Sequence, residues 1–563
     1  MKRLCLTALV LAALTSACGS GPTPIDPTPA PAAPVEVQLL AFNDFHGNLE
    51  PPSGRNGQVF TADGAVEAGG VEYLATWVEK LRAPHGRTLV VAAGDNIGAT
   101  PLISGAFHDE PTIEALGLVG LMLTSVGNHE FDEGWQELVR MQKGGCHPKD
   151  GCFGGGTFKG AAFQYLAANV ILDNSGETVF PPYVIKRFEG IPVAFVGMTL
   201  EGTPAILTAN GKRGLVFKDE ADTLNALVPK LRAEGAEAIV VLLHEGGMIT
   251  GRYDGCEGIS GKIVKLVSRF DKAVDIVVTG HTHAAYVCEI DGRLVTSAMH
   301  AGRLLTDIRF ELDPVTHDVV KRSAKNIIVR RDVAKAPALT ALVDKWKTLV
   351  APVESRVVGT IAADLTRQQS PLGESVLGGV VADAQLFAEQ DASAGRAELA
   401  LMNAGGVRAD LVANAASGSE KPGEVTYGEV FAVQPFVNPL VTMTLTGAQL
   451  ESIFESQFRG SHGTPKVLQV SHNVKIGFDP DGPEGDRIDP KNVSIDGKPL
   501  DLKRGYRVVM NEYMAGGGDA FDLFKEGTDR VIGITDVDAL ELYLRKHPKL
   551  APHALGRLVK VTR

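Results

Sequence analysis

One hexapeptide combines an amide, an imidazole and two carboxylates: Gly127-Asn128-His129-Glu130-Phe131-Asp132. The other candidate functional residues of the sequence are interpreted around it. The hexapeptide directly follows the apolar run 121–126, whose length is that of a buried strand. In phosphate ester chemistry, Asn128 is a neutral oxygen ligand, His129 is an acid, and Asp132 can hold that acid. The same residues are also compatible with a polar strand-to-loop turn, because short motifs match by chance.

Four other apolar runs also end in polar residues that can bind metals. They are residues 35–42 before Asn43-Asp44-Phe45-His46-Gly47, 88–93 before Gly94-Asp95-Asn96, 238–243 before His244-Glu245-Gly246-Gly247, and 274–278 before Thr279-Gly280-His281-Thr282-His283. Near-continuous Val, Ile and Leu runs separated by helical stretches predict strands buried on both faces, between helices. Because ligands of open α/β sheets bind outside the carboxyl ends of the strands, we expect these polar residues to meet at one edge. The alternative for any one histidine is a satisfied place in the core.

The first of these segments presents a carboxylate and an imidazole together. Asp44 and His46 are two residues apart, and in an extended chain both side chains would point to the same side. A helix is predicted over residues 70–82, which follow. Its apolar residues recur at helical spacing, so that face belongs to the core: Val71, Leu74, Trp77, Val78 and Leu81.

Counted together, the strand ends supply seven candidate metal ligands: Asp44, His46, Asp95, Asn128, His244, His281 and His283. Seven are too many for one tetrahedral ion with an open position. They suit two divalent ions that share a bridging carboxylate, about 3.5–4 Å apart, which clamp the attacking and leaving oxygens of a displacement at phosphorus. Mixed His, Asp and Asn ligands accept zinc, manganese, cobalt or magnesium.

These motifs, in this order, resemble those of the calcineurin-like metallophosphoesterases. More narrowly, they are similar to the bacterial 5'-nucleotidase and UDP-sugar hydrolase family, and the resemblance covers nearly the whole mature chain. It implies an α/β protein with two parts. The first is an N-terminal β-sandwich flanked by helices, and the second is a C-terminal α/β substrate-binding domain.

The resemblance also implies a role for each residue at the strand ends. Asp95 would bridge the two metals. Asp44, His46 and His283 would complete one metal site, and Asn128, His244 and His281 would complete the other. His283 stands where some family members have Gln. His129 would lie over the phosphorus and donate a proton to the leaving oxygen, and Asp132 would hold its tautomer and keep it cationic.

A second series of elements predicts a substrate-binding domain. A predicted strand over 399–402 is followed by Asn403-Ala404-Gly405-Gly406-Val407-Arg408. The glycines let the backbone approach a ligand closely, and Arg408 can bind a phosphate through two N–H groups. The family has Gly where this chain has Ala404. By resemblance, Phe436 and Tyr513 would sandwich a nucleobase, with Asn403 near the base and Asp519 near the ribose. The alternatives are a core position for Phe436, beside Val437 and Leu440, and a solvated Arg408.

One departure from the family concerns arginine. Nucleotidases of this family often carry additional Arg residues before the helix predicted over 377–389. In this chain only Arg367 is available, several residues early. This weakens the inference to 5'-monophosphates and leaves room for cyclic nucleotides or other phosphoesters.

The N-terminus reads as an export signal. Lys2 and Arg3 precede the apolar stretch 4–14, which is too short for a membrane span and ends in small residues. Cys18 resembles the lipidated cysteine of a bacterial lipobox, although Thr15 stands where Leu is usual. Prolines recur over 21–34, as in an extended tether. We expect a periplasmic or cell-envelope lipoprotein, and ordinary cleavage to a soluble product is the alternative.

We therefore expect a signal peptide over 1–18, a Pro-rich linker over 19–35, a catalytic domain over 36–333, a linker helix over 334–355 and a substrate-binding domain over 356–563. Of the cysteines beyond the export region, closeness in sequence favours Cys146 with Cys152, which leaves Cys256 with Cys288. Zinc binding is the alternative for these four cysteines.

The net charge of −12 over 563 residues argues against a nucleic acid polymer as partner. The expected function is an exported two-metal phosphohydrolase that removes phosphate from 5'-nucleotides and so serves nucleotide catabolism. The alternatives are a 2',3'-cyclic-nucleotide phosphodiesterase or UDP-sugar hydrolase on the same scaffold, and a surface binding protein without turnover.

Overall fold

The computed structural model describes residues 33–52, 57–208, 211–391, 394–414, 420–458 and 465–561. The expected export signal and nearly all of the Pro-rich linker lie outside these residues, and so does Cys18. Residues 34–563 form one compact unit. Within the described ranges, no helix has the length and apolarity needed to cross a membrane.

A six-stranded sheet carries three of the strands predicted from apolar runs. Its order is β16-β15-β1-β4-β5-β6. The bounds are β1 Val35–Phe42, β4 Thr88–Ala93, β5 Leu121–Ser125, β6 Gln164–Leu166, β15 Leu304–Leu312 and β16 Val319–Ile328. Strands β1, β4, β5 and β6 are parallel, so their carboxyl ends lie at one edge.

A second six-stranded sheet carries the other two predicted strands, in the order β13-β14-β12-β11-β9-β8. The bounds are β8 Tyr183–Phe188, β9 Ile191–Thr199, β11 Ala238–His244, β12 Val274–Thr279, β13 Ala285–Ile290 and β14 Arg293–Ala298. Strands β9, β11, β12 and β14 are parallel to one another, and the edge strands β8 and β13 are antiparallel to β9 and β14. Short ribbons pair β2 Gln58–Thr61 with β3 Gly64–Glu67, and β7 Val170–Leu172 with β10 Leu215–Phe217.

The two sheets pack face to face, which corrects one expectation from the sequence. Leu40 of β1 packs toward the helices, whereas Leu39 joins an apolar layer shared with Val240 of the second sheet. The strands are therefore buried on both faces, as expected, but helices cover only one face of each sheet. The prediction of helices on both faces was wrong because an apolar run does not reveal what covers it. The β-sandwich implied by the family resemblance is confirmed.

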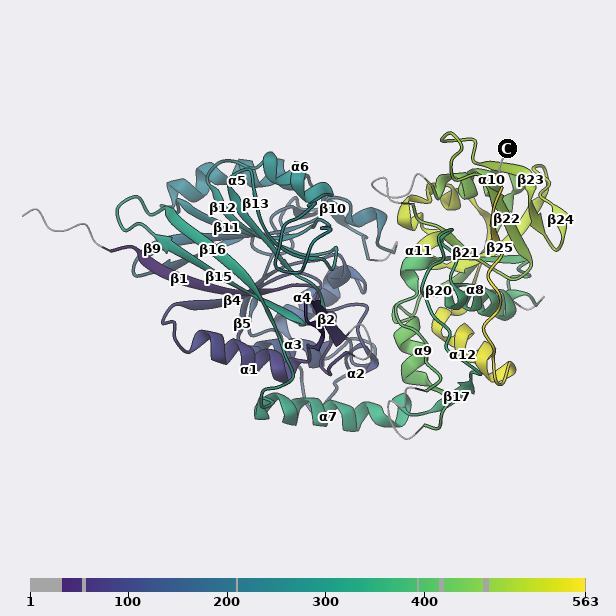
Figure 1. The fold of residues 1–563 in the computed structure, drawn as a ribbon, viewed down its shortest axis with the longest axis horizontal. Helices are drawn as coiled ribbons and strands as arrows, with labels where there is room; N and C mark the ends of the chain where they lie inside the picture. The colour runs from purple at the N-terminus through teal and green to yellow at the C-terminus, as the bar shows by residue number, and fades with distance from the viewer. Residues whose placement is uncertain are drawn as a thin grey trace, which may run out of the picture. The chain divides into compact units, whose positions relative to one another are not determined.

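Helices cover the outer faces of the sandwich (Figure 1). They are α1 Val71–Arg82, α2 Leu102–Gly105, α3 Glu110–Val119 and α4 Trp135–Lys143 beside the first sheet, and α5 Glu220–Ala233 and α6 Lys262–Ser268 beside the second. Helix α1 starts after Gly70, has Glu72 in its first turn and ends with basic residues in its last turn, a charge order that suits the helix dipole. It lies where the sequence predicted a helix.

Helix α7, Pro337–Glu354, follows the sandwich and lies within the range 334–355 predicted for a linker helix. It buries one face against α2 and α3 through Leu339, Val343 and Trp346. This burial anchors the helix that connects the two halves of the chain.

The second half is a mixed α/β arrangement. A five-stranded sheet has the order β21-β18-β25-β20-β26, with bounds β18 Leu399–Asn403, β20 Pro439–Thr446, β21 Leu468–Val470, β25 Gly505–Asn511 and β26 Thr528–Thr535. A smaller sheet joins β22 Val474–Phe478, β23 Ile488–Ile495, β24 Lys498–Pro499 and β27 Leu558–Lys560, and β17 Val357–Thr360 pairs with β19 Glu424–Thr426. The helices are α8 Val376–Glu389, α9 Tyr427–Val433, α10 Gly447–Ser456, α11 Glu512–Ala515 and α12 Asp536–Lys546. The expected C-terminal α/β fold is confirmed.

Two disulfides join the cysteines in the pairing favoured by closeness in sequence. Cys146 pairs with Cys152, with Cα atoms 4.5 Å apart, and Cys256 pairs with Cys288, with Cα atoms 5.1 Å apart. The alternative of zinc binding by these cysteines is wrong. The second disulfide ties β13 to the loop after β11, close in sequence to His281 and His283.

Removing the second disulfide is expected to destabilise the protein by about 2–4 kcal/mol, because it closes the longer loop and restricts the unfolded chain more. The Cys256→Ser, Cys288→Ser double variant should therefore unfold at a lower temperature than wild type in calorimetry. The Cys146→Ser, Cys152→Ser variant is the matched control. The Cys146–Cys152 disulfide spans a sequence separation of 6, against 32 for Cys256–Cys288. The control variant should therefore lose less stability than the first variant, and a larger loss of stability would contradict this account.

Candidate metal centre and substrate pocket

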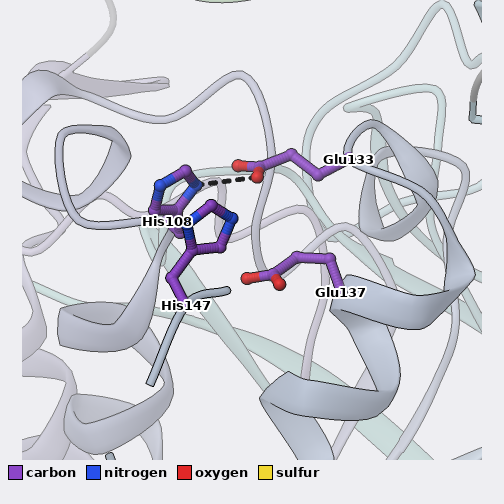
Figure 2. A group of neighbouring side chains, drawn as sticks. All are labelled: His108, Glu133, Glu137 and His147. Atoms are coloured by element: carbon purple, nitrogen blue, oxygen red, sulfur yellow. Dashed lines mark hydrogen bonds and ion pairs between the residues drawn. The ribbon is translucent and has the colours of Figure 1, made fainter. Parts of the chain in front are cut away.

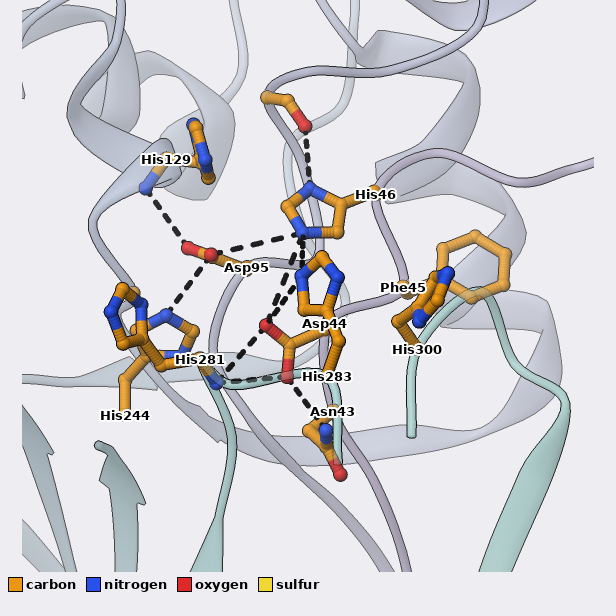
Figure 3. Close-up of polar contacts among 12 residues, drawn as sticks. Asn43, Asp44, Phe45, His46, Asp95, His129, His244, His281, His283 and His300 are labelled. Atoms are coloured by element: carbon orange, nitrogen blue, oxygen red, sulfur yellow. Dashed lines mark hydrogen bonds and ion pairs between the residues drawn. The ribbon is translucent and has the colours of Figure 1, made fainter. Parts of the chain in front are cut away.

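The carboxyl ends of β1, β4, β5, β11 and β12 meet, and their polar residues form one buried cluster (Figure 3). Backbone hydrogen bonds join the loops. The Asp44 N–H donates to the Gly94 carbonyl at 3.0 Å, and the His46 N–H donates to the Asp95 carbonyl at 3.0 Å. Two loops that lie about fifty residues apart in the sequence are thereby fixed to each other.

The seven candidate ligands separate into two groups around Asp95. In the first, the His283 Nε2 atom lies 3.4 Å from Asp44 Oδ1 and 3.1 Å from His46 Nε2. In the second, the Asn128 Oδ1 atom lies 3.2 Å from His244 Nε2 and 3.0 Å from His281 Nδ1. The structure brings all of these residues together.

Asp95 lies between the two groups. Its Oδ2 atom is 3.0 Å from His244 Nε2 and 3.8 Å from His46 Nε2. Its Oδ1 atom accepts the His129 backbone N–H at 2.9 Å. One carboxylate thus reaches both groups and the start of the hexapeptide that contains His129, which is the position that a bridging ligand would need.

The backbone at these ligands corrects the expectation of an extended chain at Asp44 and His46. Their φ angles are 50° and 46°, and Asp95, His281 and His283 also have positive φ. The left-handed region is unfavourable for residues other than glycine and clusters at functional sites. Asp44 and His46 therefore converge through a tight turn, not through the two-residue period of a strand.

Hydrogen bonds at the far side of the rings orient two of the histidines. His46 Nδ1 lies 2.8 Å from the Gly98 carbonyl, and His244 Nδ1 lies 2.7 Å from the Ala93 carbonyl. A carbonyl oxygen only accepts, so each Nδ1 donates a proton and each Nε2 faces the cluster, where its lone pair is available when the ring is neutral. This is the usual arrangement of metal-binding histidines.

The electrostatics of the cluster suit bound cations. Burial lowers the pKa of His46 to about 3 and that of His281 to about 4, so both rings are neutral ligands near pH 7. Burial alone would raise the pKa of Asp95, but the neighbouring His244 and His129 lower it well below its usual range. Buried, ionised carboxylates beside neutral imidazoles need positive charge nearby, and this donor set fits divalent metals.

His129 and Asp132 form a close pair beside the cluster. His129 Nδ1 lies 2.8 Å from Asp132 Oδ2, and the His129 ring centre is 5.2 Å from that of His46. Burial lowers the pKa of His129, but the charges of Asp132 and Asp95 outweigh burial and raise it overall. The imidazolium is therefore available as an acid at the edge of the cluster.

The residues predicted to bind substrate line one cavity of about 430 Å³. They are Asn403, Arg408, Phe436, Tyr513 and Asp519, and the same cavity is lined by His129, Asp132, Asn128 and His281. The Phe436 ring lies nearly parallel to the His129 ring, with centres 5.5 Å apart and 15° between planes. Phe436 is partly exposed, so the alternative of a core position is wrong for it.

Comparison with known families decides the assignment of the chain. Residues 37–285 match the calcineurin-like phosphoesterases, and residues 357–526 match the C-terminal domain of 5'-nucleotidases. The chain belongs to the 5'-nucleotidase family. The family resemblance expected from the sequence is confirmed, and calcineurin-like phosphoesterases bind two metal ions.

Individual relatives of this 5'-nucleotidase family member vary in length and description. An endonuclease of Bacillus subtilis is 30% identical over 523 residues, which are 92% of this chain and 40% of that protein. A cell wall protein of Listeria monocytogenes is 32% identical over 530 residues, which are 88% of this chain and 65% of that protein. The chain thus spans less than two thirds of the length of either relative.

A solved structure supports the same two-part fold. The crystal structure of a 5'-nucleotidase precursor from Thermus thermophilus matches with a TM-score of 0.75 and 25% identity. The match covers 94% of this chain and all of that chain. The metallophosphoesterase domain and the C-terminal domain of this family member are therefore both present.

Sequence reasoning missed Glu130, which holds the site's loops together. Its carboxylate accepts the backbone N–H groups of Asp95, Asn96 and Gly127 at 2.7–2.8 Å. A Cβ atom at Gly127 would lie 2.1 Å from Asp95 Oδ1, so only glycine fits there. The position of Glu130 inside the hexapeptide was the available signal, but it did not indicate which backbone groups the side chain would bind.

His300 and Lys466 were also missed. The His300 ring lies against His283, with centres 4.5 Å apart, and Arg303 Nη2 donates to His300 Nδ1 at 2.8 Å. Lys466 lines the cavity and lies 3.7 Å from Asp519 Oδ1. Both residues are isolated in the sequence, and no spacing pattern pointed to them.

The pairing of His129 with Asp132 predicts a shifted pH profile in the Asp132→Asn variant. A raised pKa keeps His129 protonated to higher pH, and loss of the Asp132 charge removes one of the main causes of that increase. The alkaline limb of kcat should therefore move to lower pH by roughly 1–2 units, the size usual for one adjacent charge. Measuring kcat from pH 5 to 10 for both proteins tests this; an unmoved limb would contradict it.

Proposed function

We propose that this member of the 5'-nucleotidase family is an exported two-metal phosphohydrolase that removes the phosphate from 5'-nucleotides. The observation that carries the proposal is the single cavity lined both by the His129–Asp132 pair and by aromatic side chains. Its volume of about 430 Å³ falls within the range of roughly 300–1,000 Å³ usual for small-molecule sites. A mononucleotide has a phosphate for the His129–Asp132 pair and a base for the aromatic side chains.

The proposed metal ligands are the two groups that share Asp95. Asp44, His46 and His283 would hold one ion, and Asn128, His244 and His281 would hold the other, with Asp95 in both. Two divalent ions bound there would supply Lewis acidity to a phosphate ester. The donor set accepts zinc, manganese, cobalt or magnesium.

The side chains around the metals would handle the proton and the charge of the substrate. His129 donates a proton to the leaving ribose oxygen, and Asp132 holds the ring through Nδ1. Arg408 binds phosphate with its guanidinium. Burial lowers the pKa of Arg408, and the charge of Arg367 adds to this effect, so the arginine that stands early in the sequence lies within Coulombic range of Arg408.

The residues of the C-terminal domain that line the cavity would bind the nucleoside. Phe436 and Tyr513 both line the cavity and would supply the aromatic rings on which a base stacks. Asn403 Nδ2 donates to Asp519 Oδ2 at 3.2 Å, and the Asp519 backbone N–H donates to the Tyr513 hydroxyl at 2.9 Å. These contacts hold the polar groups in place for the base and the ribose before substrate binds.

The last part of the proposal is that the protein is exported. Both disulfides persist only where the environment is oxidising, and one relative is a cell wall protein. We place the protein in the periplasm or cell envelope, attached through a lipid on Cys18. Mass spectrometry of the N-terminal peptide from membranes tests the anchor: a peptide that begins elsewhere, or an unmodified cysteine, would contradict it.

The test of the function is phosphate release from AMP, UDP-glucose, 2',3'-cyclic AMP and p-nitrophenyl phosphate, with and without chelator. Metal-dependent turnover of AMP in preference to the others is expected. Preference for the cyclic or sugar substrate would keep the chemistry and overturn the specificity. Binding of AMP without release of phosphate from any substrate, with metal supplied, would indicate a binding protein.

The Phe436→Ala variant is expected to raise KM for AMP by about tenfold or more, because stacking of one base contributes about 1–3 kcal/mol. p-Nitrophenyl phosphate has no nucleobase, so its KM should change little and serves as the internal control. Steady-state kinetics on both substrates makes the measurement. Equal changes for the two substrates would mean that Phe436 acts through its contact with His129 and not through the base.

A further inference from the structure

A second cluster of metal-binding side chains lies outside the dinuclear centre (Figure 2). It consists of His108, between α2 and α3, Glu133, just before α4, Glu137, in the first turn of α4, and His147, inside the loop closed by the Cys146–Cys152 disulfide. One ligand atom from each of the four residues lies within 4.8 Å of every other. Segments far apart in the sequence thus bring two imidazoles and two carboxylates to one point.

The contacts within this cluster are short. His108 Nδ1 lies 2.7 Å from Glu133 Oε2, and His108 Nε2 lies 2.9 Å from Asp150 Oδ2. The His108 and His147 rings stack, with centres 3.7 Å apart and 17° between planes. Both rings therefore reach the same point of the cluster.

The contacts of His147 tie it to Asp150 within the disulfide loop. Its Nδ1 atom accepts the Asp150 backbone N–H at 3.1 Å. The same nitrogen lies 3.0 Å from Asp150 Oδ2. Asp150 thus contacts both histidines of the cluster.

Negative charge exceeds positive charge around the cluster. Arg140 lies 2.6 Å from both Glu110 and Glu137, so its single charge is divided between two carboxylates. Glu133 and Asp150 share His108. Even with His108 protonated, the four carboxylates outnumber the cations Arg140, His108 and Lys149, and a divalent ion would add positive charge at the cluster.

We propose that His108, Glu133, Glu137 and His147 form a structural zinc site, separate from the dinuclear centre. Two imidazole nitrogens and two carboxylate oxygens are a donor set that zinc accepts in tetrahedral geometry, and four protein ligands make the closed site typical of structural zinc. The ion would bind the disulfide loop to the segment that directly follows Asp132. A cavity of about 40 Å³ is lined by His108, Glu133 and Glu137 and also by His129 and Asp132, so the site supports the segment that carries the proposed acid.

The test is the number of zinc ions bound per chain by the untagged protein. Wild type, His147→Gln and Glu133→Gln are each equilibrated with Zn²⁺, separated from free metal and analysed by mass spectrometry of the elements. Both variants should bind one ion fewer than wild type. Glu133 is about half exposed, so its variant is expected to fold even if loss of His147 disturbs the loop.

The matched control is His85→Gln, which removes a histidine outside both clusters and should bind as many ions as wild type. The readout is a difference between proteins, so it does not depend on how fully the dinuclear centre is loaded or on whether the protein hydrolyses nucleotides. Equal zinc content in wild type and both variants would overturn the proposal and leave an ion-pair network around a protonated His108.

Discussion

Replacing His129 with alanine is expected to lower kcat for AMP by about 10²–10⁴-fold, the usual contribution of a positioned general acid, while the bound metal is unchanged. His129 lies outside both groups of candidate metal ligands. Its ring is held through Nδ1 by Asp132 at 2.8 Å and lies beside the cavity that Phe436 also lines. Removing it takes away the proton source for the leaving oxygen without removing a donor to the metals.

The leaving group of the substrate supplies the control for this experiment. The alkoxide released from AMP needs a proton, whereas p-nitrophenolate is stable without one. The His129→Ala loss should therefore be much smaller with p-nitrophenyl phosphate. Equal losses of kcat on the two substrates would show that His129 stabilises charge and does not donate the proton. Loss of metal from the variant would show that His129 is itself a metal ligand.

The seven candidate ligands could be found from the sequence because the signal is local at each of them. Each one stands at or just beyond the end of an apolar run, and parallel strands bring such ends to one edge. The sequence could not reveal the turn that orients Asp44 and His46, since a positive φ at residues other than glycine follows from contacts such as those to Gly94 and Asp95. It also could not reveal that each sheet packs on the other.

The supporting residues escaped prediction for a different reason. Glu130, His300 and Lys466 act through partners that are distant in sequence or through backbone groups, so nothing in their spacing marks them. The cluster of His108 and His147 depends on the fold in the same way, because residues of three separate segments meet only when α4 and the disulfide loop are in place. Residues that do chemistry at the ends of strands can be predicted from the sequence, whereas supporting contacts between residues distant in the sequence have to be observed in the structure.

Replacing Asp95 is expected to cause the largest loss of activity. The Asp95→Asn variant should lose at least about 10³-fold in kcat/KM, because several kcal/mol of stabilisation by the metals would be removed. Although burial opposes it, the Asp95 carboxylate raises the pKa of His244 to about 10, so the substitution also leaves His244 without its anionic partner. Metal content and phosphate release measured on the same sample test both effects.

A buried aspartate of the same sandwich is the matched control. Asp275 accepts the Ile239 backbone N–H at 3.0 Å, and burial raises its pKa to about 7; Asp275→Asn should keep the metals and the activity. The number of ions lost from Asp95→Asn then assigns its role. Loss of both ions indicates a bridge between the two groups. Loss of one, with the other retained, would place the carboxylate in a single site, and retention of both would remove Asp95 from the metal centre.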